Sequence, residues 1–227
     1  MKISEIFYSI QGEGTLVGVP SVFVRTSGCN LRCVWCDTPY TSWAPEGDER
    51  SVDRIVEAVS SFRASHVVVT GGEPMIAPQI GELTQRLRQC GLHITIETAG
   101  TVNIPVACDL MSISPKLKNS TPFEREDGRW AQQHERLRWQ PAILRDLMAA
   151  YPYQLKFVIK DPPDLVEVEH MRETLEAPRS HVLLMPEGTQ ADTIRQRGLW
   201  LAEVCKEHGY RFSPRLHIDL WGDKRGV

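Results

Sequence analysis

Short runs of β-branched and aromatic residues alternate with helical patterns along most of the chain, and this alternation constrains the fold more than any other feature. Strands are expected at 3–10, 21–24, 67–69, 93–96, 110–113, 155–159, 182–185 and 216–221. Between many of them apolar residues recur at helical spacing, which predicts helices near 52–62, 80–87, 143–147, 165–175 and 192–208. We therefore expect an α/β fold in which a curved, mainly parallel sheet forms an incomplete βα barrel.

Length and composition fit a single domain. The chain has 227 residues, of which 41% are hydrophobic, and this is enough to bury one substantial core. We therefore expect one domain over residues 1–227. The stretch near 117–140 is charged and rich in loop-forming residues. We expect an insertion there, either a mobile lid or an ordinary surface segment.

Charge and cysteine usage bear on partners and compartment. A net charge of −3 gives no electrostatic reason to expect nucleic-acid or membrane binding. The polar start of the chain is unlike a signal peptide, and no apolar run approaches the ~18 residues of a membrane span. Cys90, Cys108 and Cys205 lie far apart beside apolar neighbours, and we expect them to be small buried hydrophobes. Because the other cysteines concentrate in one motif, we expect a soluble, cytoplasmic protein.

That motif is a C-x3-C-x2-C run formed by Cys29, Cys33 and Cys36. Three thiolates can bind three corners of a cubane iron-sulfur cluster and leave one iron open for another ligand. No fourth cysteine follows within thirty residues, and the first histidine after the run is His66. The alternative is a zinc knuckle with a distant fourth ligand.

Polar and glycine-rich segments recur where the expected strands end. They are Gln11-Gly12-Glu13, Arg25 with the cysteine loop, Thr70-Gly71-Gly72-Glu73, Glu97-Thr98, Ser114-Pro115-Lys116 and Met185-Pro186-Glu187-Gly188. In parallel sheets the active site collects at the carboxyl ends of the strands. The Gly71-Gly72 turn offers bare backbone to a ligand, and Glu73 offers a carboxylate to an ammonium group. An amino acid held there could chelate the open iron.

The cysteine motif followed by Gly71-Gly72-Glu73-Pro74 resembles the radical S-adenosylmethionine (SAM) superfamily. Within it, three further features resemble the 7-carboxy-7-deazaguanine synthase family: the opening Tyr8-Ser9-Ile10-Gln11-Gly12-Glu13-Gly14, Arg25 four residues before Cys29, and Trp35-Cys36-Asp37-Thr38. The resemblance runs from residue 3 to the end of the chain. It implies a single radical SAM domain and the usual superfamily spacing in the cluster loop.

The resemblance also implies roles for individual residues. Cys29, Cys33 and Cys36 would hold a 4Fe-4S cluster. The SAM site would comprise Trp35, Asp37, Gly72, Glu73, Ser114, Pro115, Lys116, Met185, Pro186, Glu187 and Gly188. The pterin substrate would contact Ile10, Gln11, Gly12, Arg25, Thr70 and Val227, with Arg25 on its carboxylate. No catalytic residue is implied beyond these ligands.

Four residues have a structural alternative to a role in the site. The resemblance implies that Thr38 binds Mg²⁺, and a hydroxyl is a hard oxygen donor suited to that ion. Before Pro39, a threonine could equally be a capping or turn residue. Arg25 and Glu13 could instead form a structural ion pair, and Lys116 could be a solvated surface cation.

The implied activity is that of a radical SAM lyase in 7-deazapurine (queuosine) biosynthesis. It converts 6-carboxy-5,6,7,8-tetrahydropterin to 7-carboxy-7-deazaguanine with loss of ammonia. The resemblance implies a homodimer and a flavodoxin- or ferredoxin-type electron donor. An alternative enzyme is an activase that installs a glycyl radical on a partner protein, and an alternative of another class is a zinc-stabilised binding module.

Overall fold

The computed structural model describes all residues from 1 to 227 and contains one nine-stranded sheet, in the order β3-β1-β2-β4-β5-β6-β7-β8-β9. The strands are β1 (Lys2–Ile10), β2 (Pro20–Thr26), β3 (Asp48–Glu49), β4 (His66–Gly71), β5 (His93–Thr98), β6 (Leu110–Ile113), β7 (Tyr153–Ile159), β8 (Val182–Pro186) and β9 (Arg211–Phe212). Neighbours from β2 to β9 are parallel, whereas β1 pairs antiparallel with both β2 and β3.

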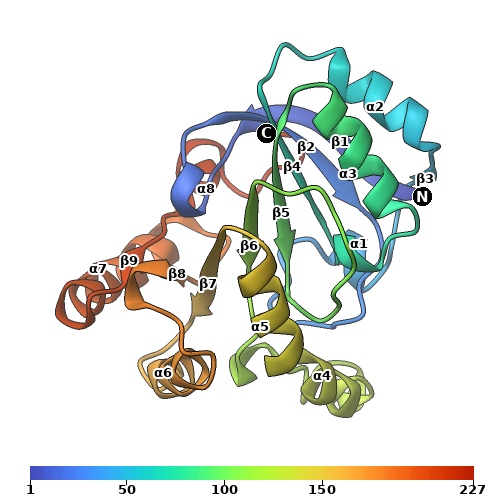
Figure 1. Cartoon of the computed structure of the whole chain (residues 1–227). Coiled ribbons are helices and arrows are strands. Elements are labelled where there is room, and N and C mark those ends of the chain that lie inside the picture. The colour runs from blue at the N-terminus through green and yellow to red at the C-terminus, as the bar shows by residue number, and fades with distance from the viewer.

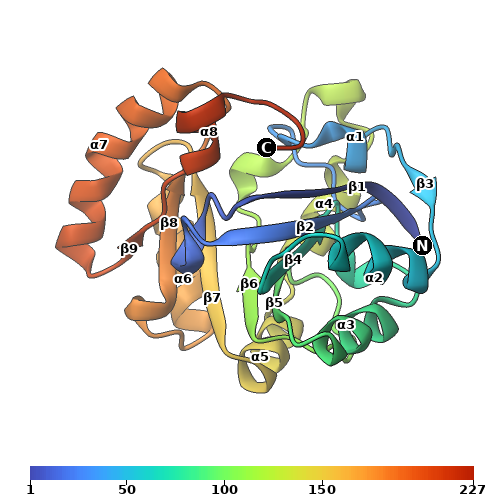
Figure 2. The same cartoon turned by 90° about the horizontal axis from the view of Figure 1, so that it is seen from above.

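Eight α-helices accompany the sheet. They are α1 (Pro39–Ser42), α2 (Val52–Ser60), α3 (Ile80–Gln89), α4 (Ala131–Arg138), α5 (Pro141–Ala150), α6 (Asp164–Thr174), α7 (Ala191–His208) and α8 (Leu216–Trp221). Figures 1 and 2 show the sheet as a curved wall with α2, α3, α5 and α7 along its outer side. The edge strands β3 and β9 do not pair, so the barrel is incomplete, as the sequence predicts. No helix has the length and apolar character that crossing a membrane requires.

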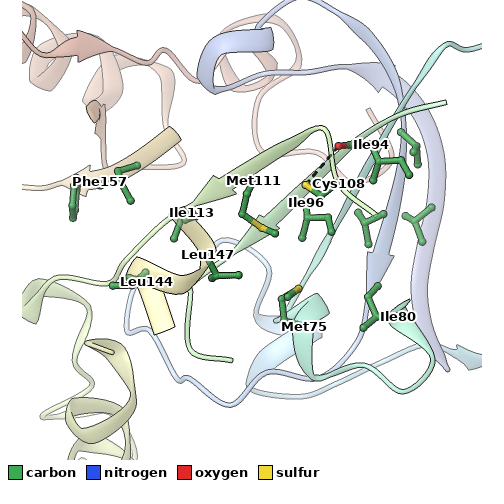
Figure 3. Packing of buried hydrophobic residues seen from close by; sticks show 14 of the residues in the cluster. Met75, Ile80, Ile94, Ile96, Cys108, Met111, Ile113, Leu144, Leu147 and Phe157 are labelled. Atoms are coloured by element: carbon green, nitrogen blue, oxygen red, sulfur yellow. Dashed lines mark hydrogen bonds between the residues drawn. The ribbon is translucent and has the colours of Figure 1, made fainter. Parts of the chain in front are cut away.

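Successive side chains of a strand point to opposite faces of the sheet, so one set packs in the core and the other faces the site. In β7, Leu155, Phe157 and Ile159 belong to the main hydrophobic cluster, while Gln154 and Lys156 alternate with them. The same cluster takes Met111 and Ile113 from β6, which lie beside Leu147 and Leu144 of α5 in Figure 3. Each such fully buried side chain stabilises the fold by roughly 1.5–3 kcal/mol. The alternate residues are therefore free to line the concave face.

Two expectations about local structure are wrong. Residues Leu216–Trp221 form helix α8, not a terminal strand. Their short apolar alternation fits either element, and β9 already occupies this edge of the sheet, so the segment buries only Ile218 while Leu220 and Trp221 stay exposed. Cys90 is exposed as well, because it caps the end of α3, whereas Cys108 and Cys205 are buried as expected.

Candidate active site

A cavity of about 250 Å³ lies on the concave face of the sheet. Alternate strand residues line it, including Phe23 and Arg25 of β2, Thr70 of β4, Glu97 of β5 and Lys156 of β7. These are the positions that face away from the helices. The cavity therefore follows directly from the two-residue period of a sheet whose outer face packs against helices.

The three cysteines of the motif all line this cavity. Cys29 and Cys33 lie in the loop after β2, and burial raises the pKa of the Cys29 thiol to about 12 and that of Cys33 further. Cys29 Sγ accepts a hydrogen bond from the Leu31 N–H at 3.3 Å, and Cys36 Sγ lies 3.3 Å from Ser42 Oγ. Nearby positive iron would favour the thiolates that burial disfavours.

The arrangement fits a cluster. Cys29, Cys33 and Cys36 line one cavity, and in a cubane each thiolate binds a different iron. Three cysteines at this spacing can therefore supply all the protein ligands of a cluster that keeps one iron open.

The segment 117–140 is ordered and packs against the cysteine loop. It contains helix α4, whose His134 is buried and accepts the Arg32 N–H at 3.1 Å. Burial lowers the pKa of His134 to about 4, which keeps the imidazole neutral and able to accept. Trp35 Nε1 donates to the carbonyl of Asn119 at 3.1 Å. The segment therefore supports the loop that carries the cysteines.

The Gly71-Gly72 turn lies against the start of the same loop. Gly71 has a φ of +134°, and the Gly72 N–H donates to Thr26 O at 3.2 Å. A Cβ at Gly72 would come within 2.1 Å of Gly28 O. Only glycine allows this close approach of two backbones.

Gly72→Ala is accordingly expected to lower the free energy of unfolding by about 2 kcal/mol, because backbone cannot move aside as a flexible side chain does. The variant should also load less cluster. Chemical denaturation and iron analysis measure both effects. Gly198→Ala is the matched control, since an added methyl there meets only the Phe212 ring at ordinary contact distance; equal stability losses in the two variants would contradict this view of the turn.

Glu73 does not line the cavity. Its buried carboxylate accepts from Thr98 Oγ1 at 2.7 Å, from the Ala99 N–H at 2.8 Å and from the Met75 N–H at 3.1 Å. These bonds fix the turn and join β4 to β5. Contact of Glu73 with a cofactor amine stays a prediction.

Arg25 lines the cavity and does not pair with Glu13. Its guanidinium lies 3.7 Å from Glu5 Oε1 and 5.5 Å from the centre of the Phe7 ring. The buried Nε has no hydrogen-bond partner. The alternative of an Arg25–Glu13 ion pair is therefore wrong, and the arginine keeps donors for a ligand.

Glu97 joins two of the predicted substrate contacts. Its Oε1 accepts from Gln11 Nε2 at 3.1 Å, and its Oε2 accepts from Thr70 Oγ1 at 2.8 Å. Thr70 reaches the cavity because it lies near the carboxyl end of β4, as expected. Gln11 reaches the cavity for a different reason. Strand β1 runs antiparallel to β2, and the turn after it crosses to β7, where the Thr15 N–H donates to Gln154 Oε1 at 2.9 Å.

Charged side chains form a buried network across the cavity. Lys156 pairs with Glu13 and lies 4.0 Å from Glu97, while Arg215 pairs with Glu13 and Asp37. Burial alone would raise the pKa of Glu13, but Lys156 and Arg215 hold it far below its ordinary value. Burial alone would lower the pKa of Lys156, but Glu13 and Glu97 raise it. Both groups stay ionised.

Thr38 lies at the cavity beside the third cysteine. Its carbonyl accepts the Thr41 N–H at 2.9 Å, so its backbone begins helix α1. Its hydroxyl makes no capping hydrogen bond and lies 3.8 Å from Cys36 Sγ. Inside the turn the hydroxyl accepts one hydrogen bond, from Thr41 Oγ1 at 3.4 Å.

The structure brings most of the sequence-predicted residues to one cavity. Those that line it are Ile10, Gln11, Gly12, Arg25, Cys29, Cys33, Trp35, Cys36, Asp37, Thr38, Thr70, Gly72, Ser114, Lys116, Met185 and Val227. Those that lie outside its lining are Glu73, Pro115, Pro186, Glu187 and Gly188. Lys116 is not a free surface cation, because its Nζ donates to Ser114 O and Oγ at 2.8 Å each.

Sequence reasoning missed several lining residues, namely Ser112, Lys156, Arg215 and His217. Lys156 carries a signal that could have been used. It interrupts an apolar strand, and a charged residue at an alternating buried position needs a charged partner. Arg215 and His217 carry no such signal, because the sequence predicts a strand at 216–221 where the chain forms helix α8.

Comparisons with known proteins agree with this geometry. A family model described as the Radical SAM superfamily matches residues 23–114. The chain is 46% identical to the 7-carboxy-7-deazaguanine synthase of Halobacterium salinarum, over 98% of this chain and 91% of the relative. It is 43% identical to that of Rhodopirellula baltica, over 100% and 89%. Among solved structures, QueE from Escherichia coli matches with a TM-score of 0.69 and 26% identity, over 95% and 94%.

An incomplete βα barrel whose cavity is lined by the three cysteines of this motif defines a radical SAM protein, a class that uses a 4Fe-4S cluster and SAM. Within that class, identity of 43–46% over nearly the whole chain is decisive. The chain belongs to the 7-carboxy-7-deazaguanine synthase family, whose members are lyases of 7-deazapurine biosynthesis.

Proposed function

We propose that this cavity converts 6-carboxy-5,6,7,8-tetrahydropterin to 7-carboxy-7-deazaguanine with release of ammonia. The observation that carries the proposal is that two chemically unlike sets of residues line one cavity. One set is Cys29, Cys33 and Cys36 with the predicted SAM contacts, which we call the SAM wall, and the other is Arg25 and Glu97 with the predicted substrate contacts, which we call the pterin wall. A pterin with a carboxylate offers an anion to the arginine and ring N–H groups to the glutamate.

The cysteine loop would hold the cluster. When bound, cluster and SAM supply the reducing electron and the carbon radical that starts rearrangement of the substrate. The chain's own residues place that chemistry. Trp35, Asp37, Gly72, Ser114 and Lys116 line the wall nearest the loop and would hold SAM, with Met185 completing it.

The second wall would orient the substrate. The Arg25 guanidinium lies over Phe7, and its Nε faces Glu5 Oε1 at 3.7 Å, so it is held in place while Nη1 and Nη2 stay available to a ligand. Glu97 accepts hydrogen bonds from Gln11 and Thr70. Lys156 keeps its proton on Nζ because Glu13 and Glu97 flank it. The buried setting excludes water from a reactive intermediate.

Mg²⁺ would bind Thr38 and the substrate, since Mg²⁺ takes few protein ligands and fills its shell with water and substrate oxygens. Thr38→Ala should keep the cluster and still cleave SAM, yet lose most of the magnesium stimulation of product formation. Thr38→Ser should retain that stimulation because the hydroxyl survives. Magnesium titrations of the product rate measure this. If the alanine variant responds to Mg²⁺ as the parent does, Thr38 is only a turn residue.

The family resemblance also bears on the oligomeric state and on the source of electrons. We propose a homodimer reduced by a flavodoxin- or ferredoxin-type protein, with residues 1–227 acting as one radical SAM domain and 117–140 as its insertion. All six cysteines are free, which supports a reducing cytoplasm.

Metal analysis and SAM turnover test the proposal together. Protein reconstituted anaerobically should contain iron and sulfide and, with a chemical reductant, cleave SAM faster when the carboxytetrahydropterin is present. Tight binding of one zinc per chain would defeat it. SAM cleavage that produces a glycyl radical on an added partner protein, and leaves the pterin unchanged, would favour an activase instead.

A further inference from the structure

Arg215 makes three polar contacts with three separate segments. Its side chain is 6% exposed, and its Nε donates to Glu13 Oε1 at 3.1 Å. Its Nη2 donates to Asp37 Oδ2, and its Nη1 donates to the carbonyl of Gly188. These partners lie in the turn after β1, in the cysteine loop and in the loop after β8. One guanidinium thus joins parts of the chain that are far apart in sequence.

The partners of Arg215 connect to different ligand contacts. Asp37 follows the last cysteine and is a predicted SAM contact, whereas Glu13 pairs with Lys156, which lies 4.0 Å from Glu97 beside the predicted pterin contacts Gln11 and Thr70. The network therefore runs Glu97, Lys156, Glu13, Arg215, Asp37, with the charge alternating at every step. Arg215 is the one cation between Glu13 and Asp37, which would otherwise repel each other.

Asp37 is fixed through one oxygen only. Its Oδ2 is bound by Arg215, while Oδ1 has no protein partner and 41% of the side chain remains exposed at the cavity. If Arg215 served only to stabilise the fold, we would expect both oxygens of the Asp37 carboxylate to be paired and buried. Buried ion pairs are in general weak contributors to stability.

We propose that Arg215 is a positioning residue that fixes Asp37 and Glu13 relative to each other, and so sets the spacing between the SAM and pterin halves of the cavity. This rests on the proposed function, because Asp37 and Glu13 act here as parts of the two ligand walls. A guanidinium suits the task, since its planar fork directs several N–H groups at fixed angles. A lysine ammonium keeps the charge but cannot reproduce that fork.

The test compares Arg215→Lys with the parent, using cluster-loaded protein without reductant so that nothing turns over. We expect the dissociation constants of SAM and of the carboxytetrahydropterin each to rise about tenfold, with iron content unchanged. Arg172→Lys is the matched control. Arg172 also forms a partly buried ion pair, with Glu169 of α6, but lies away from the cavity, so both dissociation constants should stay at the parent value.

A double-mutant cycle separates positioning from general damage. If Arg215 acts on SAM through Asp37, then Arg215→Lys adds little to the SAM affinity already lost in Asp37→Asn. Fully additive losses would overturn the proposal, as would loss of the cluster in Arg215→Lys or unchanged affinity for both ligands. If the parent protein itself binds neither ligand, the proposed function fails rather than this inference.

Discussion

Replacing Cys29, Cys33 or Cys36 by alanine will abolish reductive cleavage of SAM. The three sulfurs line one cavity wall, and no other cysteine lines that cavity. A cubane that already has one open corner would keep only two protein anchors after any of these changes. The charge-transfer absorption, the iron and sulfide content and the formation of 5′-deoxyadenosine measure the effect. We expect each of them to fall to background.

Cys90→Ala is the matched control for these variants. Cys90 is exposed at the end of α3 and away from the cavity, so cluster content and SAM cleavage should equal those of the parent. Full cluster occupancy in any one of the three motif variants would refute the assignment of the cluster to this loop.

Arg25→Lys will weaken binding of the pterin by about a hundredfold while leaving SAM cleavage in the absence of substrate nearly unchanged. A planar guanidinium forms two parallel charge-assisted bonds with a carboxylate, and an ammonium cannot. Arg25 lines the cavity, and its only ion pair is the 3.7 Å contact of Nε with Glu5 Oε1, so Nη1 and Nη2 stay available to such a ligand. Equilibrium binding of the carboxytetrahydropterin to cluster-loaded protein measures the loss.

The control for Arg25 is Arg54→Lys, which changes an exposed ion pair with Glu57 on α2. It should leave pterin binding at the parent value, since exposed pairs contribute little. If Arg25→Lys binds the pterin normally, then Arg25 is structural, its partner is Glu5 alone, and the substrate wall lies elsewhere.

Most of the sheet is predictable from sequence because each parallel strand is a short local signal. Strand β4 is predicted by the β-branched run Val67, Val68 and Val69. The glycines that follow predict the turn that lines the cavity. The end of the chain is not predictable in this way. Six residues such as Leu216–Trp221 fit a strand or a helix, and the outcome depends on β9 already occupying the sheet edge.

The residues of the candidate site differ in the same way: those in local motifs are predictable from sequence, and those placed by long-range contacts are not. Residues in contiguous motifs, such as Cys29 to Cys36, lie where their spacing predicts. Gln11 also reaches the cavity, but the rule about strand ends does not explain it, because β1 is antiparallel and its turn crosses to β7. Arg215 could not be found at all, since its contact with Asp37 joins residues 178 positions apart. Only the folded chain reveals such a partner.

Product analysis after anaerobic turnover is the decisive test of whether this cavity converts the pterin to the deazaguanine. Cluster-loaded protein is incubated with 6-carboxy-5,6,7,8-tetrahydropterin, SAM, Mg²⁺ and a reductant, and both 7-carboxy-7-deazaguanine and ammonia are quantified. We expect the two products to form in equal amounts, and neither to form without SAM. SAM cleavage that leaves the pterin intact, with neither product detected, would contradict it.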